Sequence, residues 1–174
     1  MAWITPVYNR TESDVLYAKA LIEKIKNYGY DSLTLQEKSD WDSELPGCRN
    51  VSDLNRIENN CQYLGGLLNL ELDTKTDWDY ETTPLEADIQ RICDNVSAIK
   101  NKILLTVQVD FPATPELPIN NIYKLNTLEL ILFMANNALD YMYLNFGELS
   151  ELNETWAEID DKQLYWQEGY LEIH

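Results

Sequence analysis

Histidine is almost missing from this chain of 174 residues, and its one copy, His174, is the last residue. Nucleophilic arrangements that need a histidine, and nearly all histidine-containing zinc sites, are therefore excluded. The three cysteines, Cys48, Cys61 and Cys93, form no CxxC pair and are too few for a four-cysteine metal site. No glycine-rich phosphate-binding motif occurs either. We expect no catalytic residues, no metal and no cofactor, and we predict that the chain is not an enzyme.

Basic residues are also scarce, since 13 Lys and Arg stand against 30 Asp and Glu, for a net charge of −17. A surface this acidic repels nucleic acid and anionic lipid, so we expect neither as a partner. The charge has two interpretations that remain open: a solvated, self-repelling surface, or mimicry of nucleic acid.

Long apolar runs are missing as well. The longest, Leu128 to Ala135, is interrupted by Glu129 and is too short to cross a bilayer. The opening MAWITPVYNR lacks a basic stretch followed by an apolar one, so we expect no signal peptide and synthesis in a reducing cytoplasm.

Helical periodicity is what the chain does have. Apolar residues at helical spacing predict long helices over about 13–28, 52–70, 83–105 and 121–145. The capping box Thr34–Glu37 predicts a short helix, and Thr83-Pro84-Leu85-Glu86 combines an N-cap, a proline and a reciprocating glutamate. The predicted inward positions are Val15, Ala18, Ile22 and Ile25; Leu54, Ile57, Cys61, Leu64 and Leu68; Ile89, Ile92, Cys93, Val96, Ile99 and Ile103; and Leu125, Leu128, Leu132, Ala135, Leu139, Met142 and Phe146.

Three of these helices begin alike. The segments Asp53–Asn60, Asp88–Asn95 and Lys124–Ile131 align, and each places an amide residue, Asn55, Gln90 or Asn126, beside an apolar seam. Buried amides must be hydrogen-bonded, so we predict that these three bridge helices or hold loop carbonyls. The alignment fits a pseudo-repeat or a chance similarity between amphipathic helices. Three unequal copies with different connectors favour a compact antiparallel bundle over a solenoid.

The predicted fold is therefore mainly α: an antiparallel bundle of three to four long helices with a short extended or β-like acidic C-terminal tail. We divide the chain into an extended arm at 1–12, the bundle at 13–146 and an acidic aromatic tail at 147–174. The tail has eight acids and one base, and its aromatics lack a core of their own. Aromatic residues in a polar frame suit interfaces. We predict that Trp3, Trp156, Tyr165, Trp166 and Tyr170 bind partners.

Several segments resemble a family of proteins encoded in Firmicutes phages and prophages. The similar segments are WITPVYNRTESDVLYAK, LTLQEKSDW, VSDLNRIENNCQYL and KLNTLE, with a weaker similarity in TWAEID and YWQEG. Within them, the structural motif of the family corresponds here to Asp53, Leu54, Asn55, Arg56, Ile57 and Glu58. The run Leu45-Pro46-Gly47-Cys48-Arg49 departs from the family pattern, which leaves that loop in doubt.

The resemblance implies a virion structural or adaptor protein of the tail, baseplate or fibre region, made in the host bacterial cytoplasm. Its expected partners are other virion proteins and copies of itself, in an oligomer or multi-copy assembly. The alternative is an acidic inhibitor that mimics nucleic acid and binds a host protein.

Overall fold

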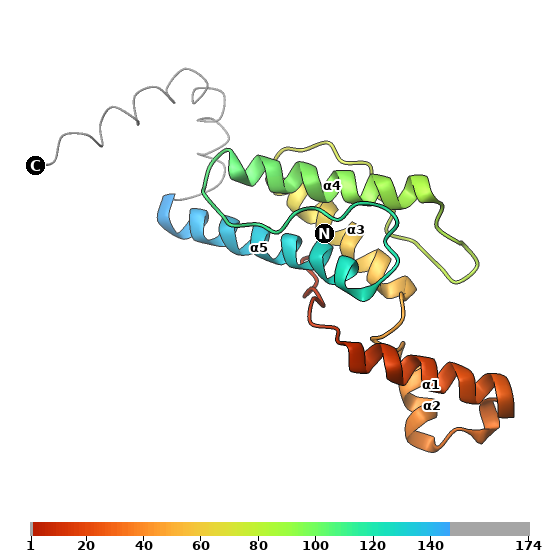
Figure 1. Cartoon of the computed structure of the whole chain (residues 1–174). Helices are drawn as coiled ribbons and strands as arrows, with labels where there is room; N and C mark the ends of the chain where they lie inside the picture. The colour runs from red at the N-terminus through yellow and green to blue at the C-terminus, as the bar shows by residue number, and fades with distance from the viewer. Residues whose placement is uncertain (1, 147–174) are drawn as a thin grey trace, which may run out of the picture. The chain divides into compact units, whose positions relative to one another are not determined.

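The computed structural model describes residues 2–146. This part of the chain is mainly helical and contains no strand. Contacts divide the chain into two compact units, Met1–Asn136 and Asn137–His174, and helices α1 to α4 and the larger part of α5 belong to the first. The predicted tail at 147–174 lies outside the described residues. The helices are α1 (Glu12–Tyr28), the 3-10 turn η1 (Tyr30–Ser32), α2 (Leu35–Asp42), α3 (Val51–Leu67), α4 (Glu86–Leu104) and α5 (Ile122–Phe146) (Figure 1).

Helices α1 and α2 form a hairpin with its own small core. Both begin at a reciprocal capping box, Thr11 with Asp14 and Thr34 with Glu37, and the second box was predicted. The prediction that Ile22 faces inward is wrong, because its side chain is 45% exposed. The buried stripe lies one position earlier, since Leu21 follows Ala18 by three residues and both therefore lie on the same face. The hairpin core consists of Ala18, Leu21, Leu33 and Leu45, with Ile25 and Cys48 packed against it.

The other three helices carry the larger set of buried residues. All of the predicted inward positions of α3 and α4 are buried, as are those of α5 up to Met142. The predicted start of α4 is wrong: the helix begins at Glu86, and its N-cap is Leu85 instead of Thr83. The Leu85 backbone N–H donates to the Asp88 carboxylate at 2.9 Å, so Asp88 is the residue that reaches back to the cap.

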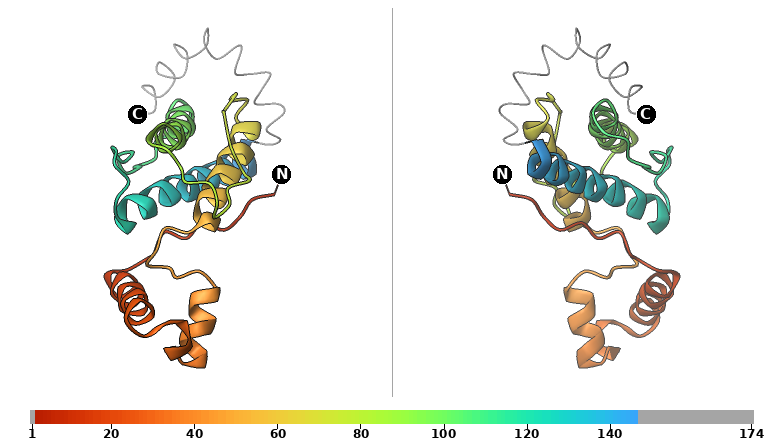
Figure 2. Two further views of the ribbon diagram at one scale, coloured as in Figure 1. Left: turned by 90° about the vertical axis from the view of Figure 1, so that its right-hand side faces the viewer. Right: turned by 90° about the vertical axis from the view of Figure 1, so that its left-hand side faces the viewer.

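Helices α3, α4 and α5 run in the same general direction, as the colour gradient in Figure 1 shows. In Figure 2, α4 is viewed along its axis and the other two are inclined to it. The predicted antiparallel arrangement is not found, and the long connectors 68–85 and 105–121 explain why. A helix of 19 residues such as α4 is about 28 Å long. The connector 105–121 reaches about 55 Å when extended, so it can return along α4 and start α5 at the same end.

We expect the Gly47→Ala substitution to destabilise the protein. A β-carbon on residue 47 would lie 2.0 Å from the backbone oxygen of Asp14, and backbone atoms cannot move aside cheaply. The cost should be about 1–3 kcal/mol, measured by urea unfolding. The matched control is Gly66→Ala, which meets nothing within 4 Å and lies in α3. There the added methyl group should stabilise the helix by up to about 1 kcal/mol. Equal effects of both substitutions would contradict this account.

The hairpin also contains a carboxyl group with an altered acidity. Lys24 Nζ donates to both Glu37 oxygens, at 2.9 and 2.7 Å, and this bond together with the Thr34 backbone N–H lowers the pKa of Glu37 to about 2. Because the folded pKa is below the unfolded value, Glu37 stabilises the hairpin above about pH 4.5. That contribution disappears as the pH falls toward 2.

An NMR titration of the Glu37 side chain should therefore show a pKa well below that of an ordinary glutamate. The Lys24→Met substitution removes the ammonium donor and should raise the pKa of Glu37 toward its ordinary value. Lys19→Met, also on α1 and exposed, serves as the control and should leave it unchanged. An unchanged pKa of Glu37 in Lys24→Met would show that the ion pair is not the cause.

Candidate functional site

Four charged side chains meet in the interior between the N-terminal segment, α3 and α5, and we call them the arm cluster: Arg10, Asp53, Arg56 and Glu129. One nitrogen of Arg10 lies 2.6 Å from Asp53 and 2.8 Å from Glu129. Arg56 lies 2.5 Å from Asp53 and 2.7 Å from Glu129. The Glu129 side chain has no exposed surface, so this carboxylate is fully buried with two guanidinium groups.

The helix geometry explains why these groups converge. Asp53 and Arg56 are three residues apart on α3, so both lie on the face toward α5. Asp53 also accepts the Asn50 backbone N–H at 3.0 Å, which caps the helix. Burial alone would lower the pKa of Arg56, but the bonds to Glu129 and Asp53 outweigh it and raise the pKa, so Arg56 stays charged.

A second buried ion pair joins α3 to α4. Arg91 donates two hydrogen bonds to Glu58, at 2.9 and 2.6 Å, and Glu58 has no exposed surface. The indole N–H of buried Trp78 donates to the same carboxylate at 3.3 Å. The bond to Glu58 is the main reason that the pKa of Arg91 is raised.

Charges balance in both groups, and this decides what they contribute. Two carboxylates face two guanidinium groups in the arm cluster, and one faces one in the Glu58–Arg91 pair. Desolvation offsets most of the Coulomb attraction of such pairs, whereas removal of a single member leaves an unpaired buried charge. The described residues contain no buried side-chain nitrogen or oxygen without a hydrogen-bond partner. The main effect of these ion pairs is therefore to determine which segments pack together, and their net contribution to the free energy of unfolding is small.

The extended segment Ala2–Arg10, called the arm below, lies along α3 and α5 and is held by side chains of these helices. Asn60 accepts the Ile4 N–H at 3.0 Å and donates to the Ile4 carbonyl at 2.7 Å, as a neighbouring strand would. Asn126 donates to the Arg10 carbonyl at 2.9 Å and accepts from the Arg10 side chain at 3.0 Å. Glu129 accepts the Val7 N–H at 2.6 Å. Helical side chains thus satisfy the backbone of an extended peptide.

The segment 73–78 is held in a similar way on α3 and α4. Asn55 accepts the Trp78 N–H at 2.8 Å and donates to the Trp78 carbonyl at 2.9 Å. Asn95 donates to the Asp73 carbonyl at 2.6 Å. Asn55 and Asn95 both lie in the aligned segments of the sequence. Asn55 and Asn126 hold backbone carbonyls of extended segments, as predicted. The prediction is wrong for Gln90, which is exposed and bonds Asp94 on its own helix.

The two helix pairs use equivalent positions of the aligned segments. In the spatial order α4, α3, α5, an arginine at the fourth position of the aligned segment on one helix binds a glutamate at the sixth position on its neighbour. The pairs are Arg91 of α4 with Glu58 of α3, and Arg56 of α3 with Glu129 of α5. The eighth position of the first helix and the third of the second hold the extended segment: Asn95 with Asn55, and Asn60 with Asn126. The pseudo-repeat of the sequence is therefore repeated in the hydrogen bonds.

The series of helices ends where these residue types are replaced. Helix α5 has Thr127 at the fourth position, and α4 has Cys93 at the sixth, so neither offers the group that a further helix would need. Cys93 is instead buried, as is Cys61 on α3, whose pKa is raised by desolvation. Within the described residues, the order α4, α3, α5 therefore has the arginine and glutamate pairing only at its two internal junctions.

The predicted site residues are placed as follows. Leu54 and Ile57 are buried, and Asp53, Asn55, Arg56 and Glu58 make the bonds given above. The ring of Trp3 lies against that of Tyr63 on α3, with 5.7 Å between centroids. Trp156, Tyr165, Trp166 and Tyr170 lie outside the described residues. Sequence reasoning missed Arg10, Arg91, Glu129 and Asn60, although the alignment already paired Glu58 with Glu129 and Arg56 with Arg91.

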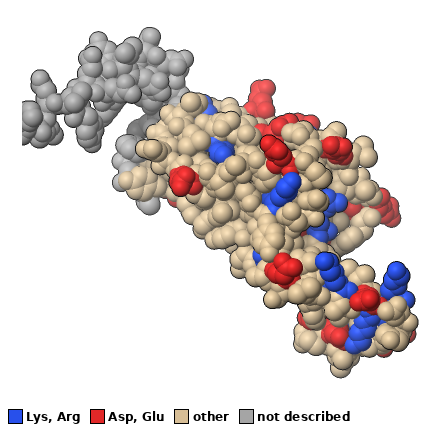
Figure 3. Space-filling view, in the orientation of Figure 1, with Lys and Arg blue, Asp and Glu red and all other residues tan. Residues whose placement is uncertain are grey.

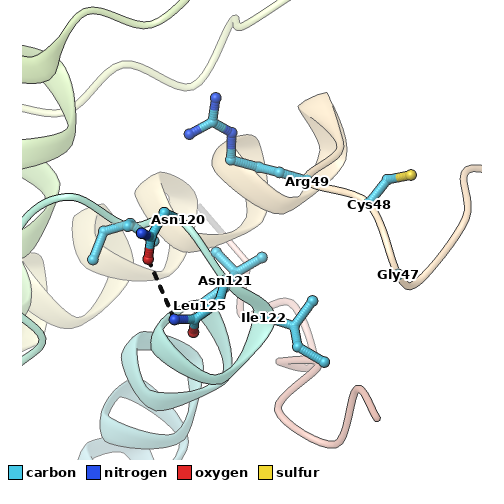
Figure 4. A pocket seen from close by; sticks show the side chains of 8 residues that line it. Gly47, Cys48, Arg49, Asn120, Asn121, Ile122 and Leu125 are labelled. Carbon is cyan, nitrogen blue, oxygen red and sulfur yellow. Dashed lines mark hydrogen bonds between the residues drawn. The ribbon is translucent and has the colours of Figure 1, made fainter. Parts of the chain in front are cut away.

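A cavity of about 490 Å³ lies between the loop 47–49 and the start of α5 (Figure 4). Figure 4 shows the Cys48 thiol pointing away from Asn120 and Asn121, and Asn121 donates to Asn120 at 3.3 Å. Burial raises the pKa of the Cys48 thiol, which makes it a poor nucleophile. The lining contains no carboxylate and its one cation, Arg49, is exposed, so it offers no acid–base pair.

Comparisons with protein-family models, with curated proteins and with solved structures found no match to this chain. Within residues 2–146, no group of three or more His, Cys, Asp or Glu is arranged to hold a metal ion. No helix in this range is long and apolar enough to cross a membrane.

Replacing Glu129 with glutamine should strongly destabilise the protein. The substitution keeps the shape of the side chain but leaves Arg10 and Arg56 with one carboxylate between them, in a site that is largely buried. We expect a loss of about 3–5 kcal/mol in urea unfolding at neutral pH. Glu116→Gln is the control, because Glu116 is exposed on the connector before α5. A loss no larger than that of the control would show that the arm cluster does not hold the helices together.

Proposed function

We propose that the chain is a structural or adaptor protein of a phage particle, in the tail, baseplate or fibre region, and that it acts through protein–protein contacts. Its body is a compact bundle of α3, α4 and α5, and the tail at 147–174 carries further contacts. Its partners are other virion proteins and copies of itself. It is made in the host bacterial cytoplasm and resides in the virion.

The main support for the proposal is the role of the DLNRIENN motif, residues 53–60, in the fold. The motif supports the resemblance to phage proteins, and its polar side chains all bond within the fold: Asp53, Arg56 and Glu58 in ion pairs, and Asn55, Asn59 and Asn60 with backbone groups of extended segments. A catalytic group needs free atoms directed at a substrate and a pKa suited to its task. These groups are instead those of a scaffold.

The exterior of the hairpin supports a role in binding. Exposed apolar side chains that gather in a patch on a folded surface mark interaction sites, whereas singly scattered ones are ordinary. Among the residues that the structure describes, about half of the exposed large apolar side chains lie on the α1–α2 hairpin, namely Leu16, Tyr17, Ile22, Tyr28, Tyr30, Leu35 and Trp41. The face drawn in Figure 3 has acidic and basic side chains interspersed over the surface, not one continuous acidic stripe. This favours a protein partner over mimicry of nucleic acid.

The proposal is tested by particle composition and by deletion of the tail. Mass spectrometry of purified particles should find the protein at a fixed number of copies per particle. Deleting residues 147–174 should leave the helical circular dichroism signal and should reduce the yield of complete particles. The full chain supplied from a plasmid should restore the yield. Normal particles from the deletion would contradict the role of the tail, and a protein found only in infected-cell extract would favour the inhibitor.

A further inference from the structure

The arm is bound to α3 and α5 as a separate peptide would be. The backbone of the arm forms hydrogen bonds with four side chains of these helices, those of Asn59, Asn60, Asn126 and Glu129. We call these four residues, together with Tyr63 and Phe133, the arm seat. Its own side chains provide specificity: Trp3 lies against Tyr63, Tyr8 against Phe133 at 4.9 Å, and Pro6 and Arg10 are buried. The arm seat therefore recognises an extended peptide with two aromatics, a proline and an arginine at this spacing.

The covalent tether of the arm differs from that of the equivalent segment 73–78. That segment leads directly into α4, the helix that supplies Asn95 to hold it. The arm is the equivalent segment for α3, the helix that supplies Asn60 to hold it. In the sequence, however, the whole hairpin, residues 11–50, separates the arm from α3. The hairpin has its own core and α1 has its own cap, since Thr11 and Asp14 bond each other without help from the arm. The residues that form the hairpin core and the α1 cap therefore do not include any residue of the arm.

We propose that the arm seat of one copy takes the arm of a second copy, so that copies of this chain are joined by arm exchange. The occupant follows from the contacts, because a peptide that matches Trp3, Pro6, Tyr8 and Arg10 is carried by another copy of the chain. The inference rests on the proposed function in one respect: it names the self-partner of a multi-copy protein.

Exchange conserves every contact that the arm makes. The arm cluster, the two ring pairs and the amide bonds are the same whether the arm and its seat belong to one chain or two. The balance is therefore decided by concentration and by the tether, as in other exchanges of identical elements. In an assembly that holds copies close together, the effective concentration of neighbouring arms is high. Linked copies should become more abundant as the protein concentration rises.

The test uses two full-length variants made in the same cell, each with one introduced cysteine. One copy carries Ala2→Cys and the other Asn59→Cys, because the Asn59 side chain donates to the Ala2 carbonyl at 2.9 Å. Both carry Cys48→Ser, which leaves only the buried Cys61 and Cys93. A disulfide between the two copies joins the arm of one to the seat of the other. We expect a disulfide-linked heterodimer on a non-reducing gel, in a fraction that rises with protein concentration.

Two controls make the result decisive. Arg10→Ala in the copy that provides the arm should lower the heterodimer fraction by about tenfold or more, whereas Asn9→Ala, an exposed arm residue, should not change it. Ala2→Cys and Asn59→Cys placed in one chain show that the pair can be joined. If they do not join, isotope-filtered NMR of mixed labelled and unlabelled natural chains replaces the cross-link, and a contact between Trp3 and Tyr63 of different copies is expected.

Monomers alone, with efficient joining inside the double variant, would overturn arm exchange, as would the lack of intermolecular contacts in the NMR measurement. That result leaves the virion role standing, since particle composition tests the role separately. Conversely, exchange in the purified protein together with absence from particles would refute the virion role and keep the exchange.

Discussion

The buried carboxylate of Glu129 is the contact on which the packing of α3, α5 and the arm depends. A charged group without solvent must be neutralised and hydrogen-bonded where it lies. Arg56 and Arg10 do this from two other segments, and the Val7 backbone N–H adds a further bond. An apolar contact would tolerate a shift along the helix, whereas a carboxylate between two guanidinium groups tolerates little. The register of three segments is thus fixed by one side chain.

The same logic explains the architecture of the helices. An arginine at the fourth position of one helix meets a glutamate at the sixth position of the next only if the two helices start at the same end. The long connectors permit this arrangement, and their extended parts are bound by asparagines at the equivalent positions. The α1–α2 hairpin is then an insertion between the arm and α3. Insertions in repeat proteins often lie on the face that binds partners.

Local features of the sequence predicted much of the fold. Helix positions and most buried residues followed from apolar periodicity, because burial of one helix face is a local pattern. Ile22 was misplaced because an adjacent leucine, Leu21, is equally apolar and only packing selects between them. The relative direction of the helices does not follow from local patterns, because it depends on the length of the connectors compared with the length of the helices. The ion pairs of Arg10 and Glu129 lie outside any local pattern, although the aligned segments held the signal for Arg56, Arg91 and both glutamates.

The arm cluster also has a consequence for how the chain is made. Arg10 and Glu129 are 119 residues apart, so the first partner leaves the ribosome long before the second. Until α5 emerges, Arg10 and Arg56 share only the Asp53 carboxylate, and the site carries an excess positive charge. Closing so long a loop is slow and is rewarded only at the end. The arm therefore acquires its full set of contacts only after α5 has been synthesised, and the fold is completed by the last of its described helices.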